Sequence, residues 1–332
     1  MIDTPSTEWL RAEMDRIHVL GMGEIMPSID AQLAERFEVH RSAERGVAAV
    51  VAEHGSVIRG IATRGRERTD AALIASLPRL EVIANFGVGY DSIDVAAARR
   101  RGIVVTNTPD VLDDEVADFT VGLLLATIRR LPQADRYVRA GRWLREGPFP
   151  LTATLRDRTV GMLGMGRIGQ RIARRLAAFE VPIVYHARRL QPDLPWRHYS
   201  NLLAMARDVD TLVAIVPGGL GTRHLVNADV LAALGPRGIF INVARGSVAD
   251  EAALLQALQA GTILAAGLDV FADEPRVPPA LLELDNVVLI PHAGSGTEHT
   301  RGIMGRLLLD NLVSWFAGRG PVTPVAETPW PP

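Results

Sequence analysis

Short apolar runs alternate with amphipathic stretches along most of the chain. In the first hundred residues the apolar runs are rich in Val and Ile, and the segments between them carry apolar residues at helical spacing. The predicted strands are residues 17–20, 57–61, 82–84 and 103–106. Strands that alternate with helices are typical of a parallel sheet covered by helices. We therefore expect the chain to begin with an α/β domain.

A second alternating series follows. Its predicted strands are residues 160–163, 183–185, 211–216, 239–243, 264–268 and 287–290. This number of strands is enough for one complete dinucleotide-binding fold. The predicted fold class is α/β with two doubly wound parallel-sheet domains, a Rossmann dinucleotide-binding domain and a smaller flavodoxin-like substrate domain.

Two predicted helices indicate how these domains connect. Residues 113–127 form a long apolar helix with an acidic first turn, which suits the helix dipole, and we expect this helix to bridge the domains. Residues 303–316 form a helix with no strand of its own to cover, so we expect it to return to the first domain, followed by a Pro-rich extended arm. The predicted domains are residues 1–108 with 294–332 for the substrate domain, and residues 109–293 for the dinucleotide-binding domain.

Composition then narrows the chemistry. A chain of 332 residues, of which 48% are hydrophobic, can bury two cores of ordinary size, and its net charge of −2 argues against a nucleic-acid or membrane-surface protein. All 36 basic residues are Arg, so an internal Schiff base and a Walker A phosphate loop are excluded. The absence of Cys excludes thiol catalysis, disulfides and Cys-ligated zinc, and we predict no metal site.

Targeting signals are not apparent in the sequence. Residues 1–8 lack the charged start and apolar core of an export signal. The longest apolar stretch, residues 121–128, is too short to span a bilayer. We therefore expect a soluble, cytoplasmic protein.

A glycine turn after the strand 160–163 indicates a bound dinucleotide. The sequence at residues 164–169 is G-x-G-x-x-G, followed by apolar residues at helical spacing. Gly164 makes the sharp turn, Gly166 lets the backbone approach a pyrophosphate, and Gly169 lets the helix pack closely on the strand. The free N–H groups of the helix start then face the phosphates.

The motif alone is weak evidence, since ordinary strand-to-helix turns also use Gly. The chain offers a comparison at residues 21–26, where a similar turn follows an apolar strand but has Met26 in place of the third glycine. We interpret this second copy as an ordinary turn.

The tip of the next strand predicts which dinucleotide binds. An acidic residue there would hold the ribose 2′-OH of NAD. This chain has His186, Arg188 and Arg189 instead, and a guanidinium group suits a 2′-phosphate. We predict NADP(H) as the preferred cofactor and NAD(H) as a weaker alternative. The other interpretation of these residues is a solvated basic loop.

Three residues with chemically active side chains lie just past three later strands. They are Arg245, Glu274 and His292. In a parallel sheet the carboxyl ends of the strands meet at one edge, where ligands of such folds bind. These residues are therefore expected to converge although they are far apart in the sequence.

Reduction of a 2-oxo acid needs residues of this kind. Arg245 can bind the carboxylate and the carbonyl oxygen through its bidentate guanidinium. His292 can donate a proton to the forming alkoxide, because imidazole changes its charge near neutral pH. Glu274 is expected to hydrogen-bond His292 and favour its imidazolium form. Asp269 is placed to receive the nicotinamide carboxamide. When each residue is considered alone, the alternative for His292 is a structural histidine and the alternative for Arg245 is a surface ion pair.

The loop at residues 86–90, at the end of a first-domain strand, is apolar and rich in glycine. The backbone N–H groups of such a loop can hold a carboxylate. A plain tight turn is the alternative interpretation.

These motifs together resemble the D-2-hydroxyacid dehydrogenases over nearly the whole chain. The matching segments are residues 85–94, 107–112, the glycine turn, 216–219, 242–246, 268–275 and 291–295. The resemblance implies that Arg245, Glu274 and His292 are the catalytic set, and that Val88 and Gly89 hold the substrate carboxylate through their amides. Cofactor contacts beyond the three glycines and the strand tip are expected from Arg167, Ile168, Val216, Pro217, Thr222, Val243, Ala244, Asp269 and Gly294.

Within that family the chain is most similar to the NADPH-dependent glyoxylate/hydroxypyruvate reductases. The resemblance also implies a homodimer that buries the segment around Trp143, whose side chain would reach the neighbouring subunit's substrate pocket; a core or rim aromatic is the alternative for this residue. The leading hypothesis is an NADPH-dependent reductase of a small 2-oxo acid. The alternatives are a 2-ketogluconate or hydroxyphenylpyruvate reductase of the same family, and a non-enzymatic NAD(P)-sensing binding protein.

Overall fold

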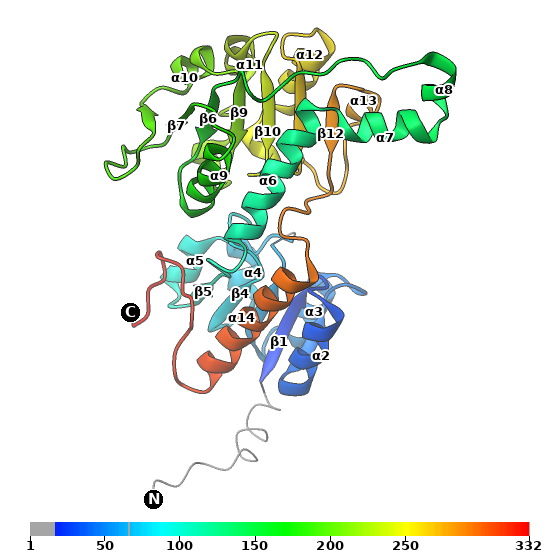
Figure 1. Ribbon diagram of the computed structural model, residues 1–332. Coiled ribbons are helices and arrows are strands. Elements are labelled where there is room, and N and C mark those ends of the chain that lie inside the picture. Colours follow the sequence, from blue (N-terminus) through cyan, green and yellow to red (C-terminus); the bar gives the residue numbers. More distant parts are fainter. Residues whose placement is uncertain (1–16, 66, 332) are drawn as a thin grey trace, which may run out of the picture. The chain divides into compact units, whose positions relative to one another are not determined.

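The computed structural model describes residues 17–65 and 67–331, and the chain divides into two compact units (Figure 1). Unit 1 lies within residues 1–112 and 297–332, and unit 2 comprises residues 113–296. Each unit is built on a parallel β-sheet, so the predicted fold class is confirmed. The expectation about an export signal concerns residues 1–8, which lie outside the described residues.

Unit 1 contains a five-stranded sheet with the order β2-β1-β3-β4-β5, in which every pairing is parallel. The strands are β1 (His18–Met22), β2 (Glu38–Arg41), β3 (Ile58–Thr63), β4 (Val82–Asn85) and β5 (Val104–Thr106). Strand β2 was not among the strands predicted from the sequence. This strand lies at the edge of the sheet and none of its four residues is buried, so it lacks the apolar signal of the other strands.

Helices cover both faces of this sheet. The helices are α2 (Pro27–Arg36), α3 (Val47–His54), α4 (Ala71–Ser76), α5 (Val95–Arg100) and α14 (Glu298–Phe316). Buried side chains from α3, α4 and α5 join one core with those of the strands. Helix α14 packs against α2 and β4, so the last helix of the chain is part of unit 1.

Unit 2 contains a seven-stranded parallel sheet with the order β12-β11-β10-β9-β6-β7-β8. Its strands are β6 (Val160–Leu163), β7 (Ile183–His186), β8 (Arg197–Tyr199), β9 (Thr211–Ala214), β10 (Ile239–Asn242), β11 (Ala265–Leu268) and β12 (Val287–Leu289). Strand β8 was not predicted from the sequence; it is a three-residue edge strand with Arg and His at its first two positions.

Two separate cores lie on the two faces of this sheet. Helices α10 (Leu202–Asp208), α11 (Ala228–Leu234) and α12 (Glu251–Gln259) contribute to one core. Helices α6 (Asp113–Ile128) and α9 (Arg167–Ala177) contribute to the other. The exposed edges of α6 and α9 are joined by ion pairs, with Arg175 bound to both Asp114 and Asp118.

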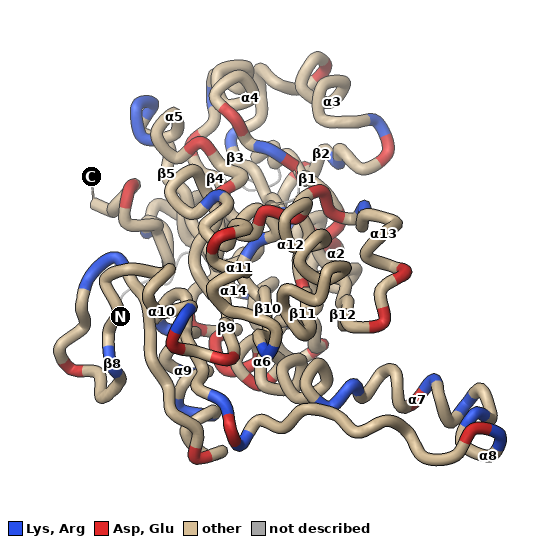
Figure 2. The backbone as a smooth tube through the Cα atoms, turned by 90° about the horizontal axis from the view of Figure 1, so that it is seen from above, with Lys and Arg blue, Asp and Glu red and all other residues tan. Residues whose placement is uncertain are grey.

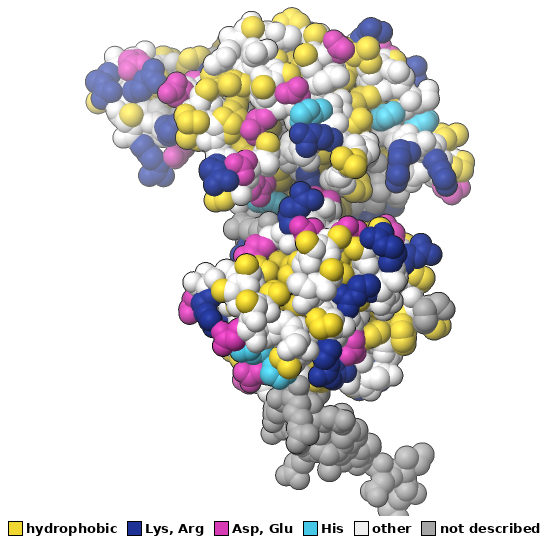
Figure 3. Space-filling view, turned by 180° about the vertical axis from the view of Figure 1, so that it is seen from behind, with side chains coloured by type: hydrophobic (Ala, Val, Ile, Leu, Met, Phe, Trp, Pro, Cys, Tyr) yellow, Lys and Arg dark blue, Asp and Glu magenta, His cyan; other side chains and the backbone are white. Residues whose placement is uncertain are grey.

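Helices α7 (Leu131–Arg139) and α8 (Arg142–Glu146) extend away from the sheet of unit 2, as Figures 1 and 2 both show. Arginine side chains gather on this extension (Figure 3). Apolar side chains are exposed on it as well, including Trp143 and Leu144. The short helix α13 (Pro279–Leu282) precedes β12, and none of the helices in the described part of the chain has the length and apolar character needed to span a bilayer.

The packing of α14 on unit 1 can be tested at Gly305. A Cβ atom on Gly305 would lie 2.3 Å from Cγ1 of Ile29 in α2. We expect Gly305→Ala to lower the free energy of unfolding by about 1–3 kcal/mol, because the close contact leaves no room for a methyl group. Chemical denaturation of the purified protein measures this change.

Gly302→Ala on the same helix is the matched control. The nearest atom to its added Cβ is the flexible guanidinium of Arg306 at 3.5 Å, so the favourable helix propensity of Ala should leave stability unchanged or raised. Equal losses for both substitutions would contradict the packing of α14 on α2.

Candidate functional site

The glycine turn after β6 has a separate physical requirement at each glycine. Gly164 has a φ of +104°, and a Cβ there would lie 2.4 Å from the carbonyl oxygen of Ile215. A Cβ on Gly169 would lie 2.6 Å from the carbonyl oxygen of Gly164. A Cβ on Gly166, in contrast, would meet no described atom within 4 Å. Gly164 and Gly169 thus serve packing, whereas Gly166 leaves space that a dinucleotide can use.

Helix α9 begins directly after Gly166, so the first-turn amides of Arg167 and Ile168 lie beside this open space. The side chain of Arg167 turns toward α6, where its Nε donates to the buried carboxylate of Asp113 at 3.2 Å. The turn therefore fits the pyrophosphate of a dinucleotide through its backbone, with an arginine charge nearby.

The similar turn at residues 21–26 is arranged differently. The carboxylate of Asp30, in the first turn of α2, accepts hydrogen bonds from the amides of Ile25 and Met26 at 3.2 and 3.1 Å. A side chain of the protein already satisfies the amides that would face a phosphate. This arrangement agrees with the interpretation of that segment as an ordinary turn.

The tip of β7 lies next to the glycine turn. The amide of Gly164 donates to the carbonyl oxygen of His186 at 2.9 Å, and Nδ1 of His186 lies 2.8 Å from the carbonyl oxygen of Tyr199 in β8. Arg188 and Arg189 follow on an exposed bend, and neither makes a hydrogen bond or ion pair with any residue that the structure describes. Their guanidinium groups are available to an anion.

Two glutamines, which the sequence analysis missed, tie this bend to the glycine turn. Nε2 of Gln191 donates to the carbonyl oxygen of Met165 at 2.8 Å, and Nε2 of Gln170 lies 3.3 Å from the same oxygen. Gln170 also donates to Oε1 of Gln191 at 3.2 Å. The buried Tyr185 holds Gln191 from the other side, since its hydroxyl accepts from the Gln191 amide at 3.0 Å. The network fixes the arginine bend relative to the turn.

The loop after β9 supplies the third predicted group of cofactor contacts. The hydroxyl of Thr222 donates to the carbonyl oxygens of Pro217 and Gly219, at 2.7 and 3.2 Å. Val216 is half-buried and Pro217 is exposed. Thr222 therefore shapes this loop from within.

The carboxyl ends of β10, β11 and β12, which are neighbours in the sheet, carry the predicted chemical residues. Nδ1 of His292 lies 2.7 Å from Oε2 of Glu274, and Oε1 of Glu274 accepts from the amide of Phe271 at 3.1 Å. The imidazole is thus held through Nδ1, and Nε2 is left for a substrate. This is the hydrogen bond that the sequence led us to expect.

The charge state of Glu274 follows from its surroundings. Burial alone would raise the pKa of Glu274, but hydrogen bonds from His292 and Phe271 and the charges of His292 and Arg245 outweigh it and lower the pKa. Glu274 is therefore a carboxylate at neutral pH, and it presents a hydrogen-bond acceptor to Nδ1 of His292.

Arg245 follows β10 and is half-buried. Its Nη1 donates to the carbonyl oxygen of Ala244 at 2.8 Å. The buried side chain of Asn242 shapes this turn, because it donates to the carbonyl oxygen of Arg245 at 3.0 Å and accepts from the amide of Ala244 at 3.1 Å. Val243 and Ala244 are buried, so only their backbones are suited to contact a ligand.

Asp269 has a structural function that the sequence analysis missed. Its side chain is buried beneath the loop that carries His292, and it accepts hydrogen bonds from the amides of Ala293 at 2.6 Å and Gly294 at 3.0 Å. The carbonyl oxygen of Asp269 also accepts from the amide of His292 at 2.8 Å. His292 itself has a φ of +54°, a strained value for a residue with a Cβ. Asp269 holds the histidine in this conformation.

In unit 1, two asparagine side chains bind carbonyl oxygens of the loop 86–90. The side chain of Asn85 donates to the carbonyl oxygens of Gly87 and Gly89 at 3.1 and 3.0 Å, and Asn107 donates to that of Val88 at 2.9 Å. Within the described part of the chain, the amides of Val88 and Gly89 donate no hydrogen bond. They are therefore free to bind a carboxylate.

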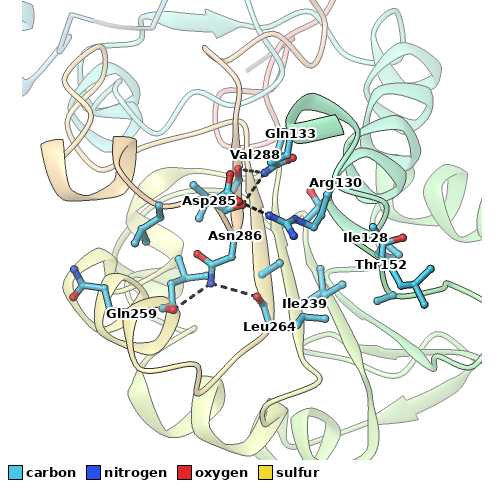
Figure 4. A pocket seen from close by; sticks show the side chains of 17 residues that line it. Ile128, Arg130, Gln133, Thr152, Ile239, Gln259, Leu264, Asp285, Asn286 and Val288 are labelled. Atoms are coloured by element: carbon cyan, nitrogen blue, oxygen red, sulfur yellow. Dashed lines mark hydrogen bonds and ion pairs between the residues drawn. The ribbon is translucent and has the colours of Figure 1, made fainter. Parts of the chain in front are cut away.

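A cavity of about 460 Å³ in unit 2 lies elsewhere. It is lined by the amino ends of β10, β11 and β12 and by the region where α6 meets α7 (Figure 4). Arg130 binds Asp285 there, and Gln133 donates to the carbonyl oxygens of Asp285 and Val287. None of the predicted site residues lines this cavity. Trp143 also lies apart from the chemical residues, on α8, where it is 63% exposed.

Comparison with known proteins identifies the family. The model of the D-isomer specific 2-hydroxyacid dehydrogenase family, NAD binding domain, matches residues 121–294. The chain is 43% identical to a glyoxylate/hydroxypyruvate reductase A of Arabidopsis thaliana, over 94% of this chain and all of that protein. It belongs to the D-isomer specific 2-hydroxyacid dehydrogenases.

Other relatives of this dehydrogenase differ in their named substrates. The hydroxyphenylpyruvate reductase of Plectranthus scutellarioides is 42% identical, over 94% of this chain and all of that protein. The solved structure of an NADPH-dependent glyoxylate/hydroxypyruvate reductase from Sinorhizobium meliloti, in complex with NADP and malonate, is 53% identical with a TM-score of 0.90. The alignment covers 95% of this chain and 98% of that one.

The different requirements of the glycines generate a test of the dinucleotide site. We expect Gly166→Ala to weaken NADPH binding by about tenfold or more without lowering the melting temperature, because its Cβ enters only the open space. Gly169→Ala should instead lower the melting temperature, since its Cβ would clash with backbone. Calorimetric titration and thermal melts measure both. A large loss of stability in Gly166→Ala, or unchanged binding, would contradict the assignment.

Proposed function

We propose that this protein is an NADPH-dependent reductase that converts a small 2-oxo acid, of the glyoxylate or hydroxypyruvate type, to the D-2-hydroxy acid. The observation that carries the proposal is the His292–Glu274 pair at the strand edge that also bears the glycine turn and Arg245. A dehydrogenase of this kind needs a proton donor and a cation together at the edge where the dinucleotide binds.

Each residue has a chemical task in this proposal. Arg245 binds the substrate carboxylate and carbonyl oxygen through its guanidinium. Nε2 of His292 donates the proton that the carbonyl oxygen takes up, and Glu274 keeps the hydrogen on Nδ1. When bound, the reduced dinucleotide supplies the hydride. The amides of Val88 and Gly89 hold the substrate carboxylate.

NADP(H) is the cofactor that the exposed bend favours. Arg188 and Arg189 stand free at the tip of β7, where a 2′-phosphate would be placed, and the Sinorhizobium meliloti relative is described in complex with NADP. NAD(H) is proposed as the weaker alternative.

A homodimer in the cytoplasm is the further part of this proposal. Trp143 on α8 is 63% exposed, Leu144 is 94% exposed and Leu151 is fully exposed, and such an apolar surface is typical of an interface. We propose that Trp143 is buried when two copies associate.

Two alternatives are weaker but distinct. Relatives of nearly equal identity are named for hydroxyphenylpyruvate and for glyoxylate or hydroxypyruvate, so an aromatic 2-oxo acid is the second candidate substrate. A protein that only senses NAD(P) would have no need for the His292–Glu274 pair. Initial rates of NADPH oxidation with glyoxylate, hydroxypyruvate, an aromatic 2-oxo acid and 2-ketogluconate separate these possibilities, and activity with none of them would overturn the proposal.

The proton donor is tested by His292→Gln. This change keeps the approximate size and polarity of the side chain but removes the transferable proton, so we expect kcat to fall by roughly 10²- to 10⁴-fold with little change in the Kd of NADPH. His299→Gln, an exposed histidine on α14, is the matched control and should keep full activity. Turnover of the His292 variant within a few-fold of the parent would refute the assignment.

Cofactor preference is tested by replacing Arg188 and Arg189 together with Ala. Loss of two charge-assisted hydrogen bonds to a 2′-phosphate should raise the KM for NADPH about 10- to 100-fold and leave the KM for NADH nearly unchanged. Arg174→Ala, at an exposed position of α9, controls for loss of surface charge. If both KM values rise equally, the arginines do not read the 2′-phosphate.

A further inference from the structure

The C-terminal segment of the chain, residues 323–328, lies against the loop 86–90 of unit 1. Part of this segment is buried, since Val325 is 4% exposed and Thr328 is 5% exposed. The amide of Val325 donates to the carbonyl oxygen of Val105 in β5, and the hydroxyl of Thr328 accepts from the amide of Val105 at 3.0 Å. Residues 325–328 are therefore held against the edge strand β5, beside which the red segment lies in Figure 1.

One end of this segment is anchored by a buried side chain of α14. Asn311 is fully buried, and its Oδ1 accepts from the amide of Thr323 at 2.9 Å. Its Nδ2 donates to the hydroxyl oxygen of Thr323, also at 2.9 Å. The position of Thr323 is thus set by the last helix of the chain.

Thr323 in turn hydrogen-bonds Asn107, whose side chain binds the loop 86–90. The hydroxyl of Thr323 donates to the carbonyl oxygen of Asn107 at 2.7 Å, and the amide of Asn107 donates to that of Thr323 at 3.3 Å. The side chain of Asn107 then donates to the carbonyl oxygen of Val88 at 2.9 Å. A chain of hydrogen bonds runs from α14 through the C-terminal segment to the loop.

A second contact lies at the other end of the loop. The hydroxyl of Tyr90 donates to Oε2 of Glu327 at 3.0 Å. Burial, and then the hydrogen bond to Glu327 and its negative charge, raise the pKa of Tyr90, so the hydroxyl stays protonated and keeps donating at neutral pH. Residues 323–328 therefore contact the end of the loop directly, at Tyr90, and reach its middle through Asn107.

The loop needs such external support. Gly87 and Gly89 flank Val88, and glycine has more backbone freedom to lose than any other residue. Two adjacent amides bind a carboxylate well only when both point to the same place, and a small misplacement of a binding group is costly. Asn85 fixes the carbonyls of the two glycines, and Asn107 fixes the one between them.

We propose that residues 323–328 position the loop 86–90, so that the amides of Val88 and Gly89 meet the substrate carboxylate in a fixed orientation. Thr323 and Glu327 are positioning residues, because they act through Asn107 and Tyr90. The inference rests on the proposed function, in which this loop holds the carboxylate of a 2-oxo acid. It assigns to the C-terminal segment a direct influence on substrate affinity.

Three substitutions in the 332-residue chain test the inference. Thr323→Val keeps the shape of the side chain but removes its hydroxyl, Tyr90→Phe removes the donor to Glu327, and Glu327→Ala removes the acceptor. We expect each to raise the KM for the 2-oxo acid about three- to tenfold, as the loss of one hydrogen bond in an orienting network would. The KM for NADPH should stay within about twofold, because the dinucleotide turn lies in unit 2.

Two comparisons separate positioning from general damage. Glu327→Gln retains an acceptor for the Tyr90 hydroxyl and should restore most of the substrate affinity that Glu327→Ala loses. Val322→Ala changes a half-exposed side chain next to the segment and should leave both KM values as they are. Tyr90→Phe combined with Glu327→Ala should cost no more than either change alone, since both remove the same bond.

Hydrogen exchange gives a measurement that does not depend on activity. We expect the amides of residues 86–90 to exchange faster in Thr323→Val than in Val322→Ala, with melting temperatures that stay close together. Unchanged exchange and unchanged substrate KM would overturn the inference, as would an equal rise in both KM values. If the parent protein reduces no 2-oxo acid, the proposed function fails, and faster exchange still shows whether the segment positions the loop.

Discussion

The part of the unit 2 sheet edge that carries Arg245, Glu274 and His292 depends on the hydrogen bonds of the buried Asp269 carboxylate. Asp269 follows β11, and its carboxylate accepts hydrogen bonds from the amides of Ala293 and Gly294, which follow β12. The histidine just before them is thereby fixed in a left-handed conformation, and its Nδ1 meets Glu274. This tie extends the backbone pairing of β11 and β12 into the loop that carries His292.

Unit 1 uses the same physical principle in a different place. Asn85 and Asn107 bind the carbonyl oxygens of the loop 86–90 from behind, and the amides of Val88 and Gly89 are left without partners among the described residues. In both units a buried polar side chain satisfies one side of a loop and leaves the other side for a ligand. Hydrogen bonds from a buried side chain hold the backbone of such a loop in a defined orientation, because hydrogen bonds are directional.

The sequence predicted those parts of the structure that have a strong local signal. Apolar runs identified the central strands, and the spacing of Gly164, Gly166 and Gly169 identified the turn. The edge strands β2 and β8 were missed because their residues are polar or half-exposed, so they do not alternate as buried strands do. The start of α14 was placed five residues late for a similar reason, since its first turn is polar, although Thr297 caps it.

The chemical residues could be named from the sequence, but their supports could not. His292 and Glu274 follow strands, and parallel topology alone brings such positions to one edge. Gln191 and Asn107 bind carbonyl oxygens of residues far away in the chain, and Gln170 binds the distant side chain of Gln191. No local sequence pattern marks such contacts. The same holds for Asp269, whose bonds to the loop after β12 exist only once the sheet has formed.

The buried charge of Asp269 and the strained backbone of His292 both cost folding free energy, and this cost argues for catalysis over simple binding of a dinucleotide. Burial raises the pKa of Asp269, although hydrogen bonds from two amides and the charge of His292 oppose the shift. Ionisation of this carboxyl group is therefore less favourable in the folded protein than in the unfolded chain, which lowers the free energy of unfolding. That cost is absent at low pH and grows as pH rises past the ordinary pKa of an aspartate. The left-handed backbone of His292 adds a further cost. A protein that only bound a dinucleotide would need the glycine turn and the arginine bend, but neither of these costs. Both are explained if the imidazole must be presented to a reacting carbonyl group in one orientation.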